Sequence, residues 1–519
     1  MKHFNRLFLL MSAGILCFLS NIHAQRPHET QVRILEGAFP KEAYKSELIT
    51  RIDEIHKIGY EKWINTAWAT MLIKENIISG ENGPKVAKVL LEDWKPNYNG
   101  YYSSGFYSGF TTEQDEVIKQ FGQAVGGNIN IARTSPPNRQ TMPVRHKLLT
   151  AICIIHDLQE AILDAAEKNK MAIMPGYTHI RHAQPMTFGH YLLSVHDVIE
   201  RSMGIVEESY NLMNISEMGC GALSGTSWPV DRNMVASYLG MEGIIENTND
   251  AVGYGDGFLI VVAGITNVMN VASRMALDLN FWSSLEYGFI NDEYKGPSFM
   301  MPQKNSNQAY LERVRVGAAK TLGYLVDVAA MPMRVPHGDM VEMLHMQDGP
   351  LFALDGVDSY LSPMIKQMKG MTVNTDRMLE VARKGFSCAS ELANQMVRDY
   401  GLDYRTAHTI IHNFVEASEN QNIPASMARS KMLDAEAVKV IGKELNMTDK
   451  RLRELLDPVY FVKVTNSQGG IAPEEVGRMI NNNREKLAQA RQRQLERIES
   501  LENAQKKMLN QLSILAGKV

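Results

Sequence analysis

The sequence predicts an all-α fold built around a central bundle of long helices. Four segments carry apolar residues at helical spacing, and short Pro- or Gly-containing breaks separate them. They are residues 144–168, 188–215, 258–287 and 306–330. No stretch of the sequence shows sustained period-two alternation, so few strands are expected. Long helices with one apolar stripe are typical of a helical bundle.

The N-terminus has the pattern of a secretory signal peptide over residues 1–24. Lys2 and Arg6 precede the apolar run Leu7–Leu19, and Ala24 supplies the small residue at a cleavage site. The apolar run is too short to span a membrane as a helix. We therefore expect a periplasmic or secreted protein, cleaved after Ala24, with no stable membrane span. An uncleaved anchor is the alternative.

The mature chain divides into three predicted helical domains. The N-terminal domain covers 25–143, the central bundle covers 144–388, and the C-terminal domain covers 389–519. Shorter helices are expected in the two outer domains, at 41–58, 61–78, 391–400, 404–420 and 434–445. The last stretch, 473–515, is strongly charged and carries an apolar stripe, which predicts a solvated surface helix.

Composition excludes several classes of protein. Apolar residues make up 45% of the 519 residues, enough for a substantial core. The formal net charge of −4 gives no support for nucleic-acid binding. The four cysteines, Cys17, Cys153, Cys220 and Cys388, are widely spaced and indicate neither a disulfide framework nor a metal knuckle. No dinucleotide fingerprint is present, and we expect no cofactor.

The most informative stretch for chemistry is residues 296–312. Pro297 and Pro302 predict a loop in its first half, and its second half opens a helix. The loop carries a hydroxyl, Ser298, and an ammonium group, Lys304, six residues apart. A helix N-terminus also favours bound negative charge. This set of groups suits removal of a proton from a carbon beside a carboxylate, because cations and N–H donors can hold the developing charge.

This loop resembles the signature of the fumarase/aspartase superfamily, a Gly-Ser-Ser-x-Met-Pro-x-Lys-x-Asn pattern followed by Glu. The resemblance implies that Ser298 is the catalytic base and that Lys304 is a catalytic group. Lys304 and Asn307 would stabilise the carbanionic intermediate, and Glu312 takes the place of the family Glu.

The match departs from the pattern at several positions. Pro297 replaces the usual Gly, and Phe299 replaces the second Ser. The spacing from Lys304 to Glu312 is one residue longer than the common pattern; without that insertion, Ser306 would fall at the Asn position.

Residues 176–185 resemble the argininosuccinate lyase segment Gly-Tyr-Thr-His-x-x-x-Ala-Gln-Pro. The resemblance places His179 at the catalytic centre, paired with Glu312, and places Thr178 and Gln184 against the substrate. A histidine near its ordinary pKa can relay a proton at neutral pH. A capping or packing role is the alternative for His179. His179 and His182 lack a third ligand in sequence, so no metal site is expected.

Further segments carry the same resemblance. Residues 219–232 match the lyase stretch Gly-Ser-Gly-Ala-Leu-Ala-Gly-Thr-x-x-Pro-x-Asp-Arg, which implies a bend that brings backbone close to substrate. Residues 247–251 resemble Asn-Ser-x-Asp-Ala, and residues 389–408 resemble the third domain of the family. The resemblance therefore spans nearly the whole mature chain.

Two predicted substrate segments depart from the family pattern. Residues 131–140 stand where the family has Gly-Arg-Ser-Arg-Asn-Asp-Gln; Arg133 and Thr134 match as substrate-binding residues, but residues 135–137 are Ser-Pro-Pro. Residues 342–352 keep Gln347 as a substrate-binding residue, but they lack the family Tyr and Lys. The identity of the substrate is therefore open.

The resemblance implies an argininosuccinate lyase-like enzyme. It would break a carbon–nitrogen bond by β-elimination from an N-substituted aspartate, a small dicarboxylate substrate, and release fumarate. It also implies a homotetramer whose active sites are shared between subunits. Two alternatives remain, namely a lyase acting on a different amino-polycarboxylate and a non-catalytic binding protein on the same scaffold.

Overall fold

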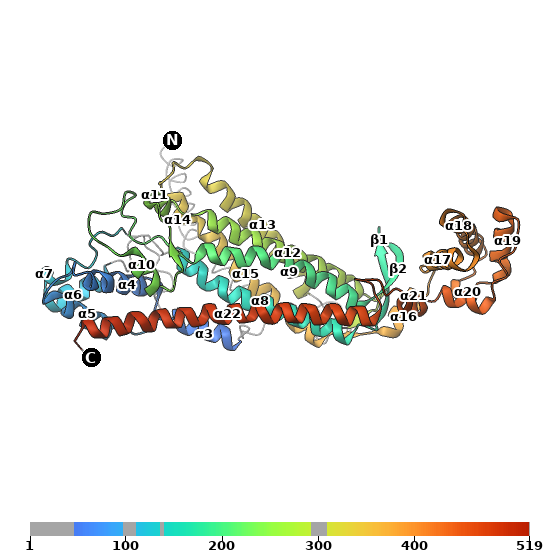
Figure 1. The fold of residues 1–519 in the computed structure, drawn as a ribbon, viewed down its shortest axis with the longest axis horizontal. Helices are drawn as coiled ribbons and strands as arrows, with labels where there is room; N and C mark the ends of the chain where they lie inside the picture. Colours follow the sequence, from blue (N-terminus) through green and yellow to red (C-terminus); the bar gives the residue numbers. More distant parts are fainter. Residues whose placement is uncertain (1–45, 97–110, 135–139, 292–308, 518–519) are drawn as a thin grey trace, which may run out of the picture. The chain divides into compact units, whose positions relative to one another are not determined.

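The computed structural model describes residues 46–96, 111–134, 140–291 and 309–517. Residues Glu47–Val519 form one compact unit, and Figure 1 shows this unit to be built almost entirely of helices. The predicted all-α fold is confirmed. The predicted signal peptide lies outside the described residues, as do Ser298, Lys304 and Asn307.

A set of long helices forms the central bundle. They are α8 (Thr141–Lys168), α9 (Phe188–Met213), α12 (Asp256–Trp282), α13 (Ala309–Ala330) and α15 (Asp348–Gly370). Helix α12 packs against α9, α13 and α15, and α8 packs against α9 and α15. The predicted apolar stripes form the buried faces of these helices.

Helix α12 is the one described helix whose length and composition would allow it to cross a membrane. In its most apolar window, 61% of the residues are buried inside the protein. Its apolar character is therefore explained by its central place in the bundle, where it contacts three other long helices.

The N-terminal part of the unit consists of shorter helices, and in it the large aromatic residues Trp63 and Trp68 are fully buried. The helices are α3 (Glu47–His56), α4 (Tyr60–Lys74), α5 (Asn82–Asp93), α6 (Thr112–Phe121) and α7 (Gln123–Gly126). The indole Nε1 of Trp63 donates to the carbonyl of Tyr238 at 2.9 Å, which ties α4 to α10 (Arg232–Tyr238).

In the part of the chain that the structure describes, strands are few and short, as predicted. Strands β1 (Ile173–Thr178) and β2 (Arg181–Thr187) form an antiparallel hairpin. The remaining short elements are β3 (Ile215–Ser216) paired in parallel with β4 (Gly243–Ile244), β5 (Ile290–Asn291) paired antiparallel with β6 (Thr372–Val373), α11 (Thr248–Val252), η1 (Met331–Arg334) and α14 (Val341–Met346).

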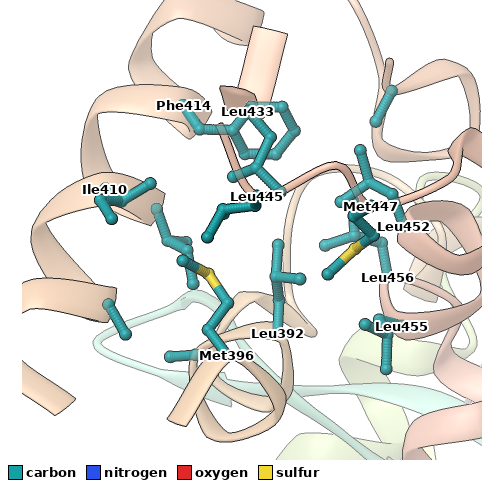
Figure 2. Packing of buried hydrophobic residues seen from close by; sticks show 14 of the residues in the cluster. Leu392, Met396, Ile410, Phe414, Leu433, Leu445, Met447, Leu452, Leu455 and Leu456 are labelled. Atoms are coloured by element: carbon teal, nitrogen blue, oxygen red, sulfur yellow. The ribbon is translucent and has the colours of Figure 1, made fainter. Parts of the chain in front are cut away.

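The helices from α17 to α20 share a hydrophobic core of their own. Figure 2 shows Leu392 and Met396 of α17 packed with Ile410 and Phe414 of α18 and with Leu433 of α19. The helices after residue 374 are α16 (Thr375–Ala382), α17 (Ala389–Tyr400), α18 (Tyr404–Asn420), η2 (Ala425–Met427), α19 (Ser430–Ile441), α20 (Asp449–Leu455) and α21 (Pro458–Val464).

The C-terminal helix α22 (Pro473–Leu515) is more than a solvated surface helix. At 43 residues it is about 65 Å long, and it packs along α8, α5, α3 and α4. Ile498, Met508 and Leu512 of its predicted stripe are fully buried. Arg491 forms ion pairs with Asp157 at 2.6 Å and Glu160 at 3.0 Å on α8. One face of the helix is buried and the other is charged. Because the buried face contacts both α8 and the N-terminal helices, the helix connects those helices to the bundle.

Two buried histidines stack where α3 meets α8. The rings of His56 and His146 lie 4.0 Å apart between centroids at an interplanar angle of 5°. The Tyr60 hydroxyl is 2.6 Å from Nδ1 of His146, and Nδ1 of His56 is 2.7 Å from the Ile52 carbonyl oxygen. Burial, with smaller contributions from Lys147 and Arg145, lowers the pKa of His146 to about 3. Burial also lowers the pKa of His56, so both rings are neutral near pH 7.

We expect this histidine pair to make stability depend on pH. In the unfolded chain His146 has an ordinary pKa of about 6.5. Below that pH the folded state therefore binds fewer protons than the unfolded state. The stabilising contribution is present above pH 6.5 and is lost as the pH falls towards 3. Between pH 7 and 5 the free energy of unfolding should drop by about 2 kcal/mol for this residue. Urea unfolding of His146→Gln should show a pH dependence smaller by that amount, whereas His408→Gln, on an exposed position, should match the wild type. An unchanged pH dependence in His146→Gln would contradict the assignment.

Candidate active site

The predicted catalytic histidine lies at the tip of the β1–β2 hairpin. Thr178 pairs with Arg181, which leaves His179 and Ile180 as a two-residue loop. Their φ values are 53° and 60°, the combination that a type I′ turn requires. A Cβ added to Gly176 would lie 2.4 Å from the carbonyl oxygen of Gln184. Glycine at 176 is therefore required for the two strands of the hairpin to approach each other.

The hairpin tip is exposed and strained. Ile180 is β-branched, which makes a positive φ unfavourable, and its side chain is 86% exposed. His179 and Thr178 are also exposed in the single chain. Non-glycine residues in this region of φ cost about 1–3 kcal/mol and are concentrated at functional sites. The turn therefore leaves His179 open on the surface of the single chain.

The second strand of the hairpin is held by the end of α16 and the start of α17. Gln184 donates from Nε2 to the Ser390 hydroxyl at 3.1 Å, and Nδ1 of His182 lies 3.3 Å from the Lys384 carbonyl oxygen. The predicted substrate residue Gln184 is thus engaged with the start of α17. Within the described residues, no group of three or more His, Cys, Asp or Glu could hold a metal ion.

Arg133 is held in place by two amide side chains. Its Nη1 donates to Oδ1 of Asn65 at 2.5 Å and to Oδ1 of Asn130 at 3.3 Å. Ala132, where the family pattern has Gly, adopts a positive φ of 60°, and the Trp68 indole donates to the Ile131 carbonyl at 3.0 Å. These contacts fix the backbone of the segment from both sides. Arg133 is consequently oriented before any ligand binds.

A buried carboxyl group, Glu113 at the start of α6, completes this network. Nδ2 of Asn65 donates to Oε2 of Glu113, which is 3% exposed. Burial raises the pKa of Glu113 to about 7, against the opposing effect of the Asn65 hydrogen bond. Burial lowers the pKa of Arg133 to about 10, against the opposing effect of Glu113. Asn65 therefore lies between two desolvated ionisable groups and hydrogen-bonds both.

The Gly-rich segment after β3 is a loop held by Arg232. Gly219, Gly221 and Gly225 all have positive φ values, which L side chains rarely adopt. The Arg232 guanidinium donates to the carbonyls of Met218, Ile245 and Glu246 at 2.7–3.0 Å. These bonds fix the loop to the segment that precedes α11. The expected bend of residues 219–232 is present in the structure.

This loop, Thr134 and the segment before α15 line a small cavity of about 90 Å³. Its lining consists of Thr134, Gln140, Glu217, Cys220, Ala222, Ala251, Val252, Tyr254, Met340, Met343 and Leu344. Among the predicted substrate residues that the structure describes, Thr134 is the one that lines it. Gln347 lies one turn further on, between α14 and α15. Burial raises the pKa of the Cys220 thiol to about 11, so this group is neutral near pH 7.

A single chain does not bring all the predicted site residues together. The hairpin ends at Thr187, the N-cap of α9, and the Gly-rich loop follows the other end of the same helix. With 26 residues, α9 separates them by about 39 Å. Glu312 is exposed near the start of α13, and within the described residues it forms no hydrogen bond or ion pair with His179. The predicted pairing of His179 with Glu312 stays a prediction.

Sequence reasoning missed the residues that support this region. Asn65, Glu113 and Gln140 carry no local motif, because their partners are distant in the chain or absent. Only the position of Gln140, at the end of a segment that resembles the family, pointed towards it.

Removal of Asn65 should be costly. Asn65→Leu leaves both Glu113 and Arg133 without their shared partner in a desolvated site, so we expect a loss of about 2–4 kcal/mol in the free energy of unfolding. Asn394→Leu is the matched control: its Nδ2 donates to Glu391 at 3.0 Å from a half-buried position of α17, but Glu391 keeps its ion pair with Arg398, so the loss should be under about 1 kcal/mol. Urea unfolding measures both, and equal losses would contradict the role of Asn65.

Comparison with known proteins gives the family. A family profile described as "Lyase" matches residues 86–323, and one described as "Argininosuccinate lyase C-terminal" matches residues 386–463. Argininosuccinate lyase of Methanococcus maripaludis is 30% identical over 482 residues, which cover 91% of this chain and 95% of that protein. The enzyme of Methanocaldococcus jannaschii is 30% identical over 461 residues, covering 87% and 90%.

Solved structures share the fold at lower identity. EDDS lyase in complex with formate has a TM-score of 0.79 and 22% identity, covering 92% of this chain and 97% of that one. Class II fumarase from Schistosoma mansoni has a TM-score of 0.61 and 12% identity, covering 81% and 96%. The predicted superfamily and enzyme class are confirmed. The chain belongs to the argininosuccinate lyase family of the fumarase/aspartase superfamily, and it is a carbon–nitrogen lyase.

Proposed function

We propose that this protein is an exported enzyme that releases fumarate from an N-substituted aspartate by β-elimination. The observation that carries the proposal is the catalytic set of Ser298, Lys304, His179 and Glu312, kept in a chain that belongs to a carbon–nitrogen lyase family. The relatives support this reaction class, since they include argininosuccinate lyases that align with most of the chain.

The elimination moves one proton and breaks one bond. Ser298 removes a proton from the substrate carbon that is β to nitrogen and that carries a carboxylate. Lys304 and Asn307 hold the negative charge that develops on that carboxylate. The electron pair then forms the carbon–carbon double bond of fumarate. The carbon–nitrogen bond breaks, and the amine leaves with a proton that His179, oriented by Glu312, supplies.

A second candidate keeps the reaction and changes the amine. Residues 135–137 and 342–352 depart from the argininosuccinate lyase pattern where the family contacts substrate. A site without those polar groups would hold argininosuccinate less well. This favours an amino-polycarboxylate, or another N-substituted aspartate, as the substrate.

The active site would be shared between the subunits of a homotetramer. Its support is the length of α9, since predicted site residues at its two ends are too far apart to meet in one chain. The exposed apolar residues on α12 and α13 also support a subunit interface. Phe281 is 55% exposed and Val326 is 62% exposed, and Val316 and Leu322 are exposed beside Val326 on the same helix.

The catalytic loop should be essential for turnover and dispensable for folding. Ser298→Ala and Lys304→Ala should each lower kcat by at least about 10²–10³-fold, because a base or a charge-stabilising donor is lost. Fumarate release is measured by ultraviolet absorbance over a panel of N-substituted aspartates. Ser359→Ala, on an exposed position of α15, is the control and should retain wild-type rates. A fully active Ser298→Ala variant would contradict the assignment.

Shared sites should allow complementation between two inactive variants. Refolding His179→Ala with Ser298→Ala at equal amounts should restore about a quarter of the wild-type activity, because random mixing gives that fraction of sites with both groups intact. Neither variant refolded alone should be active. If the mixture stays inactive while its tetramers demonstrably contain both chains, both residues come from one chain and the shared site is wrong.

A further inference from the structure

Two side-chain amides connect the first turn of α6 with Arg133. Asn65 on α4 accepts from Nη1 of Arg133 at 2.5 Å, and its Nδ2 donates to Glu113. Asn130 accepts from the same Nη1 at 3.3 Å, and its Nδ2 donates to Oε1 of Gln114 at 2.7 Å. Two adjacent residues of one helix, Glu113 and Gln114, thus act on one guanidinium nitrogen through two separate amides.

Each amide has one favourable orientation in this arrangement. An amide group has a donor end and an acceptor end, whereas a guanidinium group has donors alone. A reversed Asn65 would place its NH₂ group against the guanidinium of Arg133, and a reversed Asn130 would do the same. Because both amides are fixed in this way, the network defines a single position for Nη1 of Arg133.

The residue that follows Arg133 belongs to the predicted substrate site. Thr134 lines the cavity of about 90 Å³ described above. On the other side of Arg133, the Trp68 indole donates to the Ile131 carbonyl at 3.0 Å, and Trp68 lies one turn after Asn65 on α4. The backbone before Thr134 is therefore held at two points. A displacement of Arg133 moves Thr134 with it, because one planar peptide unit joins the two residues.

We propose that Glu113 is a positioning residue for substrate binding that acts on Thr134 through Asn65 and Arg133, an inference that rests on the proposed function. A carboxylate accepts from Nδ2 of Asn65 more strongly than a neutral carboxyl group does. The polarised amide oxygen of Asn65 then accepts more strongly from Arg133. The substrate segment is therefore held more firmly when Glu113 is ionised than when it is protonated.

The surroundings of Glu113 allow both states near neutral pH. Burial raises the pKa of Glu113 to about 7, against the opposing effect of the Asn65 hydrogen bond. Among the described residues, the charged groups that face it are Lys62 on α4, Asp93 at the end of α5, and Arg133. Lys62 and Asp93 form an ion pair at 2.8 Å, and their charges act on Glu113 in opposite directions. A rise in pH through 7 should therefore strengthen substrate binding.

Fumarate binding at two pH values tests this role. Calorimetry on the full-length protein should give nearly the same Kd at pH 6 for the wild type and Glu113→Gln, because position 113 is then uncharged in both. At pH 8 the variant should bind fumarate about fivefold more weakly, since the wild type carries the carboxylate and the variant does not. With an N-substituted aspartate that is turned over, Glu113→Gln should raise KM at pH 8 by a similar factor and leave kcat unchanged.

Glu116→Gln is the matched control. Glu116 lies one turn further along α6, where it accepts from Nε2 of Gln120 at 2.8 Å on the exposed side of the helix. Its replacement should leave the Kd for fumarate unchanged at both pH values. Gln114→Leu is a second variant that does not depend on the carboxyl group. It breaks the connection through Asn130, so it should weaken fumarate binding by about two- to fivefold at pH 6 and at pH 8 alike.

The outcomes separate this inference from the proposed function. If fumarate is released from a substrate but Glu113→Gln and the wild type have the same Kd at pH 8, the positioning role is wrong and the lyase function stands. If no N-substituted aspartate releases fumarate, the proposed function fails, and the Kd values for fumarate still decide the positioning role. Absence of fumarate binding by the wild type overturns it. A glutamate that merely stabilises the fold would lower the urea midpoint when replaced, without this pH-dependent change in Kd.

Discussion

Burial of the apolar stripes between α8, α9, α12 and α15 is the interaction on which the rest of the structure depends. The contacts are side chain to side chain along helices of more than twenty residues, so the bundle fixes the separation of its two ends. Each functional segment leaves the bundle at one end or the other. This packing places the hairpin that carries His179 and the cavity that Thr134 lines. The loops at each site determine only the local arrangement of the side chains.

Polar interactions take over where the helices end. Arg232 fixes the Gly-rich loop through three backbone carbonyls, and Asn65 connects Glu113 with Arg133. Both networks contain groups that burial alone would destabilise, so their hydrogen bonds define one arrangement of each loop. Strained backbone accompanies them at Ala132 and at His179, each in or beside a segment with a predicted substrate or catalytic role.

Much of this architecture could be predicted from the sequence, because helix periodicity and breakers are local signals. The ranges 404–420 and 473–515 match α18 and α22 at both ends. The hairpin could not be predicted, since Ile180 stands in a turn where Asn or Gly is usual. The Asn65 network was equally hidden, because its partners lie 48 and 68 residues away along the chain. The convergence of Ser298 and Lys304 on His179 stays a prediction, as it involves residues outside the described ranges.

The three described cysteines have a consequence for how the chain responds to its redox surroundings. Cys153, Cys220 and Cys388 are all free and buried, and burial raises the pKa of each thiol to about 11 or 12. The thiolate that reacts with oxidants and alkylating agents is therefore scarce and shielded while the protein is folded. The same fold can persist in a reducing or an oxidising compartment. The rate at which an alkylating agent labels these sulfurs then reports how often the fold opens.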